Sequence, residues 1–115
     1  MYFPSTLDFI ETFGLVPVEE DPSMAYCRYL KKVLGGKLEI DISFSAVAES
    51  FQVVLRCNGH DVITVSSESV KSIEIRHDGA GSGVNVLFDI DGVASEAWIG
   101  LEPEVNCRWW ALRST

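Results

Sequence analysis

Strict alternation of apolar and polar residues, repeated along most of the chain, is the pattern that most constrains its fold. The stretch KLEIDISFS, residues 37–45, places Leu38, Ile40, Ile42 and Phe44 two residues apart, with polar residues between them. Side chains of a strand alternate between the two faces of a sheet, so this pattern predicts a strand with one apolar face. Similar stretches recur at short, even spacing, which is typical of an antiparallel sheet. The predicted strands are residues 37–45, 50–57, 60–66, 70–77, 83–90, 93–101 and 105–112.

Two dipeptides between these stretches predict tight hairpins. Asn58-Gly59 and Asp91-Gly92 each supply two residues that tolerate the positive φ of a type I′ turn. The glycine-rich segment DGAGSG, residues 78–83, predicts a looser and mobile connection instead.

The segment before these strands predicts a short helix and a loop. Ser5 is a suitable N-cap, Asp8 stands three residues later as its capping-box partner, and Gly14 is a natural stop. The apolar set that we expect to face the core is Leu7, Ile10 and Phe13, with Phe9 beside it. The acidic stretch of residues 16–23, which contains two prolines, predicts a solvated loop.

Residues 22–34 are consistent with either a helix or a strand. Asp21 as N-cap and Pro22 at the first helical position favour a helix. The double glycine that follows the segment suits a hairpin turn, and Tyr26 and Tyr29 suit a pleated surface.

The fold class expected is α+β within a single domain, residues 1–115. We predict a curved antiparallel sheet of six to seven strands, with one or two N-terminal helices packed on its apolar face. A small barrel closed by the last strand is the alternative.

Charge excludes several kinds of partner. The chain has 17 acidic residues against nine Lys and Arg, a net charge of −8, so phosphate backbones and anionic membranes should be repelled. The N-terminal residues lack the basic and apolar regions of a signal peptide, so we expect a cytoplasmic protein. The three cysteines, Cys27, Cys57 and Cys107, show no paired spacing, and we expect inert, buried thiols.

Motifs that resemble catalytic or metal sites fail on their chemistry. His60-Asp61 are neighbours on a predicted strand, where adjacent side chains point to opposite faces, and His77-Asp78 is a similar pair at a strand end. The acids at Asp89 and Asp91 suggest a calcium loop, but position twelve of that loop is Gly100, which cannot ligate. The GAGSG stretch lacks the G-K-[ST] ending of a phosphate-binding loop. We therefore expect no catalytic residues, no metal and no cofactor.

The polar face of the sheet is the candidate for binding. If the apolar residues face the core, carboxylates and indole rings point outward, and aromatic residues within an acidic rim suit a basic protein partner. The predicted partner-binding residues are Glu39, Asp41, Glu74, Asp89, Glu96, Trp98 and Trp110. A merely solvated sheet face is the alternative.

The segments PSTLDFIETFG, EEDPS, KLEIDISFS and EPEVNCRWWALRS together describe a small acidic domain with an N-terminal helix and an antiparallel sheet. In these features the chain resembles the immunity proteins of bacterial polymorphic toxin systems, such as contact-dependent growth inhibition. The resemblance implies a non-enzymatic inhibitor that binds the C-terminal toxin domain of a cognate effector, often a basic nuclease. Two other functions stay open: a self-assembling structural or adaptor subunit, as in phages, and a small-molecule-binding domain.

Overall fold

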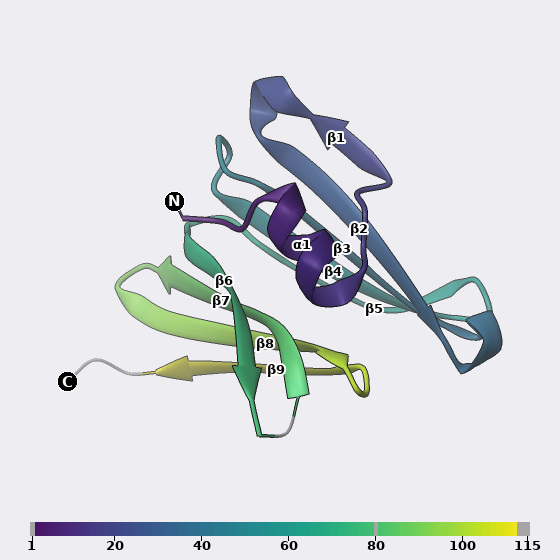
Figure 1. Cartoon of the computed structure of the whole chain (residues 1–115). Helices are drawn as coiled ribbons and strands as arrows, with labels where there is room; N and C mark the ends of the chain where they lie inside the picture. The colour runs from purple at the N-terminus through teal and green to yellow at the C-terminus, as the bar shows by residue number, and fades with distance from the viewer. Residues whose placement is uncertain (1, 80, 113–115) are drawn as a thin grey trace.

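The computed structural model describes residues 2–79 and 81–112, and these form one α-helix, two short 3-10 helices and nine strands in two antiparallel sheets (Figure 1). The elements are α1 (Thr6–Phe13), β1 (Glu19–Asp21), η1 (Pro22–Met24), β2 (Tyr26–Val33), η2 (Leu34–Gly36), β3 (Leu38–Ser45), β4 (Ser50–Cys57), β5 (His60–Ser67), β6 (Val70–Asp78), β7 (Gly81–Ile90), β8 (Val93–Glu102) and β9 (Asn106–Leu112). The strand orders are β1-β2-β3-β4-β5 and β6-β7-β8-β9. Among these residues, no helix has the length and apolar character of a membrane span.

The seven predicted strands are confirmed as β3 to β9, with ends that differ by up to two residues. The prediction of one sheet of six to seven strands is wrong, because the described residues form nine strands in two sheets. The chain leaves the five-stranded sheet between β5 and β6, where Ser69 has a positive φ of 64° and turns the backbone away from β5. Alternation of side chains identifies a strand, but it does not specify which strand lies beside it.

Most of residues 22–34 form a strand, β2, rather than an α-helix. Asp21 does cap a helical turn, accepting a hydrogen bond from the Ser23 N–H, but this 3-10 turn ends at Met24. β2 follows and pairs along its whole length with β3. The acidic stretch predicted as a loop contains β1, which pairs with the start of β2.

The predicted hairpin turns are confirmed. Asn58 and Gly59 have φ values of 52° and 80°, and Asp91 and Gly92 have 51° and 79°, as a type I′ turn requires. The connection predicted over residues 78–83 is shorter than expected, because β6 continues to Asp78 and β7 begins at Gly81. Ala80, which lies in that connection, is outside the described residues.

The helix has the predicted ends but presents a different face to the core. The Ser5–Asp8 capping box is present, and Gly14 adopts the left-handed conformation of a C-cap. Phe9 and Phe13, one helical turn apart, are buried, whereas Leu7 and Ile10 are exposed. Phe9 stacks on Tyr29 of β2 with ring centroids 4.0 Å apart.

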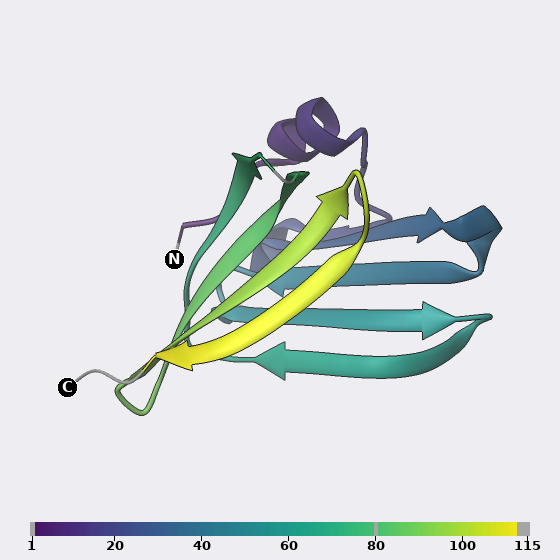
Figure 2. The same ribbon diagram turned by 90° about the horizontal axis from the view of Figure 1, so that it is seen from below.

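One apolar core joins both sheets and the helix. Figure 2 shows the two sheets facing each other at an angle, with α1 where they diverge. Phe51 of the five-stranded sheet meets Phe88 of the four-stranded sheet edge to face, with centroids 6.4 Å apart. Lys31 of β2 adds a polar contact between the sheets, since its ammonium donates to the Leu101 carbonyl at 2.6 Å and pairs with Glu102. Both sheets therefore turn one face inward and leave the other available for binding.

Candidate protein-binding surfaces

Five of the seven predicted binding residues share the outer face of the four-stranded sheet. Ala97 and Ile99 of β8 are buried in the core, so the alternate residues of β8 point to the opposite side. Register then places Asn85 beside Trp98 and Trp110 beside Glu96 on that side. The predicted residues on this outer face are Glu74, Asp89, Glu96, Trp98 and Trp110.

The two tryptophans of this outer face differ in exposure, which the sequence left open. The side chain of Trp98 lies on the outer side, but only 8% of this residue is exposed. Its neighbours across the sheet, Asn85 on β7 and Arg108 on β9, are large enough to cover an indole in the middle of a sheet. Trp110, on the edge strand β9, is half-buried. Its neighbour Trp109 points inward, where it stacks on Phe88 at 4.6 Å.

Charges on this outer face are mixed rather than uniformly acidic. Glu74 pairs with Arg76 at 3.2 Å, and Glu96 accepts a hydrogen bond from the Asn85 amide at 3.1 Å. Asp89 accepts from the N–H of Gly92 and so stabilises the β7–β8 turn. A shallow hollow of about 290 Å³ lies among these groups, and its lining includes Arg76, Asn85, Glu96, Trp98, Arg108 and Trp110. An indole beside both signs of charge can contact a polar protein surface, which is the kind of composition that protein interfaces show.

The other two predicted residues, Glu39 and Asp41, lie on the five-stranded sheet. Glu39 pairs with Arg56 at 2.8 Å, and Asp41 is only 5% exposed. Their predicted display toward solvent is therefore wrong for Asp41 and only partly realised for Glu39. The cause is the register of β2 and β4, which brings Arg28 and Arg56 to either side of Asp41.

Asp41 is the centre of a row of ion pairs that crosses the whole five-stranded sheet. Arg28 donates from Nε and Nη2 to the two carboxylate oxygens of Asp41 at 3.0 and 2.9 Å, and Arg56 contacts the same carboxylate at 2.8 Å. The row continues from Arg28 to Glu19 at 3.5 Å and from Arg56 to Asp61 at 2.8 Å. We call Glu19, Arg28, Asp41, Arg56 and Asp61 the ion-pair row; each comes from a different strand.

The pKa of Asp41 reflects these contacts. Burial alone would raise it, but hydrogen bonds and charge from Arg28 and Arg56 outweigh burial and hold the pKa below the ordinary value of an aspartate. Asp41 is therefore ionised at neutral pH, with its charge compensated within the sheet. Such a group contributes to the fold and has little charge left to attract a partner.

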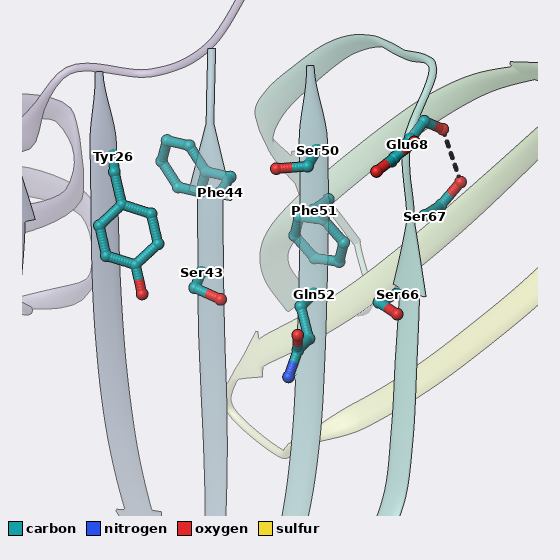
Figure 3. Close-up of a pocket in the computed structure, with 9 residues that line it drawn as sticks. All are labelled: Tyr26, Ser43, Phe44, Ser50, Phe51, Gln52, Ser66, Ser67 and Glu68. Carbon is teal, nitrogen blue, oxygen red and sulfur yellow. Dashed lines mark hydrogen bonds between the residues drawn. The ribbon is translucent and has the colours of Figure 1, made fainter. Parts of the chain in front are cut away.

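A second hollow, of about 400 Å³, lies on the outer face of the five-stranded sheet (Figure 3). Tyr26, Ser43, Gln52 and Ser66 line it from four successive strands, and Glu68 lies at one end. The Ser67 hydroxyl donates to the Glu68 carbonyl at 2.7 Å. These side chains offer hydroxyl and amide hydrogen bonds, but the lining holds no histidine, lysine or cysteine to serve as base or nucleophile.

Histidine and cysteine side chains in the described residues form no cluster that suits a metal. His77 shares a hydrogen bond of 2.7 Å with Ser82 across the β6–β7 hairpin. The prediction that the cysteines are buried is wrong for Cys57 and Cys107, which are exposed, whereas Cys27 is half-buried. Cys57 ends β4 next to the Asn58-Gly59 turn, and Cys107 lies on the edge strand β9. Alternation points both side chains inward, but at these positions no neighbouring side chain in the described part of the chain covers them.

An exposed apolar stripe on α1 and the segment that follows it is the surface that sequence reasoning missed. Leu7, Ile10, Val16 and Val18 are each between 45% and 60% exposed. Leu7, Ile10 and Val16 line one open hollow with Glu20, and Glu11, Glu19 and Asp21 are exposed nearby in the chain. We call Leu7, Ile10, Val16 and Val18 the helix stripe. The spacing of Phe9 and Phe13, a full helical turn apart and both aromatic, was the signal for the buried face.

Comparisons with known proteins bear on the fold. No protein-family model matches the chain, and a search of curated proteins finds no match. Among solved structures, the fold matches one chain of a contact-dependent growth inhibition toxin–immunity protein complex from Klebsiella pneumoniae 342, with a TM-score of 0.88 and 21% sequence identity. The match covers 96% of this chain and 96% of that chain. The two chains therefore share the same fold from end to end.

Proposed function

We propose that this protein is an immunity protein of a contact-dependent growth inhibition system, which binds a cognate toxin domain and neutralises it without turnover. The observation that carries the proposal is the shared fold, which extends over 96% of both chains and has a TM-score of 0.88 to a chain of a toxin–immunity complex.

Charge supports an inhibitor of a basic enzyme. A net charge of −8 on a 115-residue chain raises the rate at which it meets a cationic partner, and toxins that act on nucleic acids are expected to carry a cationic surface. The partner proposed is therefore the C-terminal toxin domain of the effector, with nuclease activity. Inhibition requires only that the bound chain cover the active site or lie beside it.

The docking surface proposed is the outer face of the four-stranded sheet. Glu74, Asp89 and Glu96 supply acidic groups there, and Trp110 supplies a half-buried ring that a partner can cover completely. Trp98 lies in the middle of the same face and would support Trp110 rather than insert into the partner. Glu39 and Asp41 are left out of this surface because Arg28 and Arg56 compensate their charge.

The experiment pairs the chain with the C-terminal domain of a large secreted protein encoded next to its gene. We expect co-expression to protect cells from that domain, and the purified pair to form a stable complex. A triple variant, Glu74→Lys, Asp89→Lys and Glu96→Lys, should slow association about tenfold and reduce its dependence on salt. Absence of both protection and binding would contradict the proposed function itself.

The matched control is a second triple variant, Glu20→Lys, Glu49→Lys and Glu68→Lys, which changes net charge equally at exposed positions outside this face. It should slow association much less. Equal slowing by both triples would show that total charge alone steers the partner. Loss of binding on Leu7→Lys, with the first triple unaffected, would move the docking surface to the helix stripe.

A further inference from the structure

The free edge of β5 is the longest apolar edge in the five-stranded sheet. Figure 2 shows β5 as the outermost strand of that sheet. Its eight residues read HDVITVSS, and Val62 and Ile63 are 62% and 50% exposed. The opposite edge, β1, is only three residues long and wholly acidic, which is a common way to protect an edge from pairing. β5 has one feature that protects an edge strand, a bulge at Val62. From Ile63 to Ser67 it pairs with β4 without a further register shift.

The backbone groups that β5 leaves free follow from the pairing of β4. The Asn58 N–H donates to the Lys37 carbonyl at 2.8 Å, so Asn58 faces β3. Alternate residues of an antiparallel strand bond to opposite neighbours, and Val53 therefore faces β5, where its partner is Val65. Thr64 and Ser66, on either side of Val65, direct their N–H and C=O groups away from the sheet.

We propose that a second copy of this chain pairs with β5 in antiparallel orientation, joining the two five-stranded sheets into one continuous sheet. In the register centred on Thr64, the two Thr64 residues exchange both backbone hydrogen bonds and Ile63 lies opposite Val65 of the second copy. Pairs of β-branched residues and of threonines are favourable cross-strand neighbours. The pairing is symmetric, as a two-fold dimer requires.

Charge selects this edge over the other exposed apolar surface. In the same register Asp61 lies opposite Ser67 and His60 lies opposite Glu68, so no carboxylate faces a carboxylate. Asp61 is also compensated by Arg56 at 2.8 Å. A second copy placed on the helix stripe would bring Glu20, which lines the same hollow as Leu7, Ile10 and Val16, near its own equivalent, which is repulsive. β5 therefore suits a second copy better than the helix stripe does.

Sedimentation of the purified chain alone, between about 5 and about 500 µM, tests the proposal. We expect the mass to rise from 12.7 kDa toward twice that value with concentration. Added salt should strengthen the dimer, because two copies that each carry −8 repel one another at low ionic strength. A sample that stays monomeric throughout would overturn the proposal.

Two variants and one control locate the contact. Ile63→Lys places a charge on the edge. Thr64→Pro removes the N–H that donates a hydrogen bond to the second copy. Each change should weaken the dimer at least tenfold. Leu7→Lys makes the same charge change on the helix stripe and should leave the dimer unchanged. Circular dichroism checks that the variants are folded. A dimer that survives both β5 changes, or that is lost in the control, contradicts the assignment. Since no toxin is present, failure here leaves the proposed immunity function untouched.

Discussion

Asp41 is buried on the outer side of β3, where its carboxylate lies between Arg28 and Arg56. The alternation of apolar and polar residues along β3 correctly placed Asp41 on the side opposite the buried Ile40 and Ile42. It did not predict burial, because the cover comes from Arg28 and Arg56 on neighbouring strands, and their positions depend on a register that no single stretch specifies. The same reason applies to Trp98, whose cross-strand neighbours, Asn85 and Arg108, are also set by register.

Replacing Asp41 tests the role of the ion-pair row. Asp41→Asn keeps the shape but removes the charge shared by Arg28 and Arg56, and we expect the free energy of unfolding at pH 7 to fall by about 2 kcal/mol. The control Asp61→Asn removes an exposed partner of Arg56 and should cost no more than about 0.5 kcal/mol. Urea denaturation at both positions provides the measurement. Equal losses would mean that the buried carboxylate contributes no more than a surface pair.

The pH dependence of stability follows from the lowered pKa of Asp41. Because the pKa is lower in the folded chain than in the unfolded chain, the ionised carboxylate stabilises the fold at neutral pH. That contribution is lost as pH falls through the folded-state pKa, in a window from about pH 4 downward. Wild type should therefore lose more stability than Asp41→Asn between about pH 5 and pH 2. Parallel pH profiles for the two proteins would contradict the assignment.

At the scale of elements, local sequence signals predicted the positions of turns and helix ends more accurately than the faces that the elements bury. The capping box of α1 and the two type I′ turns depend on residues next to one another in sequence, and all three are confirmed. The buried face of α1 depends on what lies beneath it. Phe9 stacks on Tyr29 because β2 is a strand at the edge of the core, and residues 22–34 gave no clear signal of that.

Paired alanine substitutions measure which face of α1 stabilises the protein. Phe9→Ala removes a fully buried ring and should lower the free energy of unfolding by about 3 to 4 kcal/mol. Leu7→Ala removes an exposed side chain two residues away and should change it by less than about 0.5 kcal/mol. Both are compared by urea denaturation. A larger loss for Leu7→Ala would mean that the helix packs through the helix stripe instead.

At the scale of the whole molecule, sequence predicted the strands but not their division into two sheets. The strands of both sheets show the same alternation, so this pattern does not separate them. The chain passes from β5 to β6 through a left-handed conformation at Ser69, and a serine in the sequence does not signal that conformation. The outer face of the four-stranded sheet carries Glu74, Asp89 and Glu96, each on a different strand. Its mixture of charges arises from Arg76 and Arg108, whose alternation phase matches that of the acids.

The shared core predicts that the two sheets unfold together. The three tryptophans, Trp98, Trp109 and Trp110, all lie on β8 and β9, so tryptophan fluorescence reports the four-stranded sheet alone. Far-ultraviolet circular dichroism reports the strands of both sheets. Since Phe51 and Phe88 meet across the core, urea should give one transition with the same midpoint by both probes.

Removing the contact between Phe51 and Phe88 tests more strictly whether the two sheets unfold together. Phe51→Ala lies in β4, outside the sheet that carries the tryptophans, yet it should shift the fluorescence midpoint as much as the circular dichroism midpoint, because unfolding either sheet exposes the core of the other. If the fluorescence midpoint stays unchanged while the dichroism midpoint falls, the sheets are independent units. In that case the strands of the four-stranded sheet alone would stabilise its outer face. The core that this sheet shares with α1 and the five-stranded sheet would not be needed.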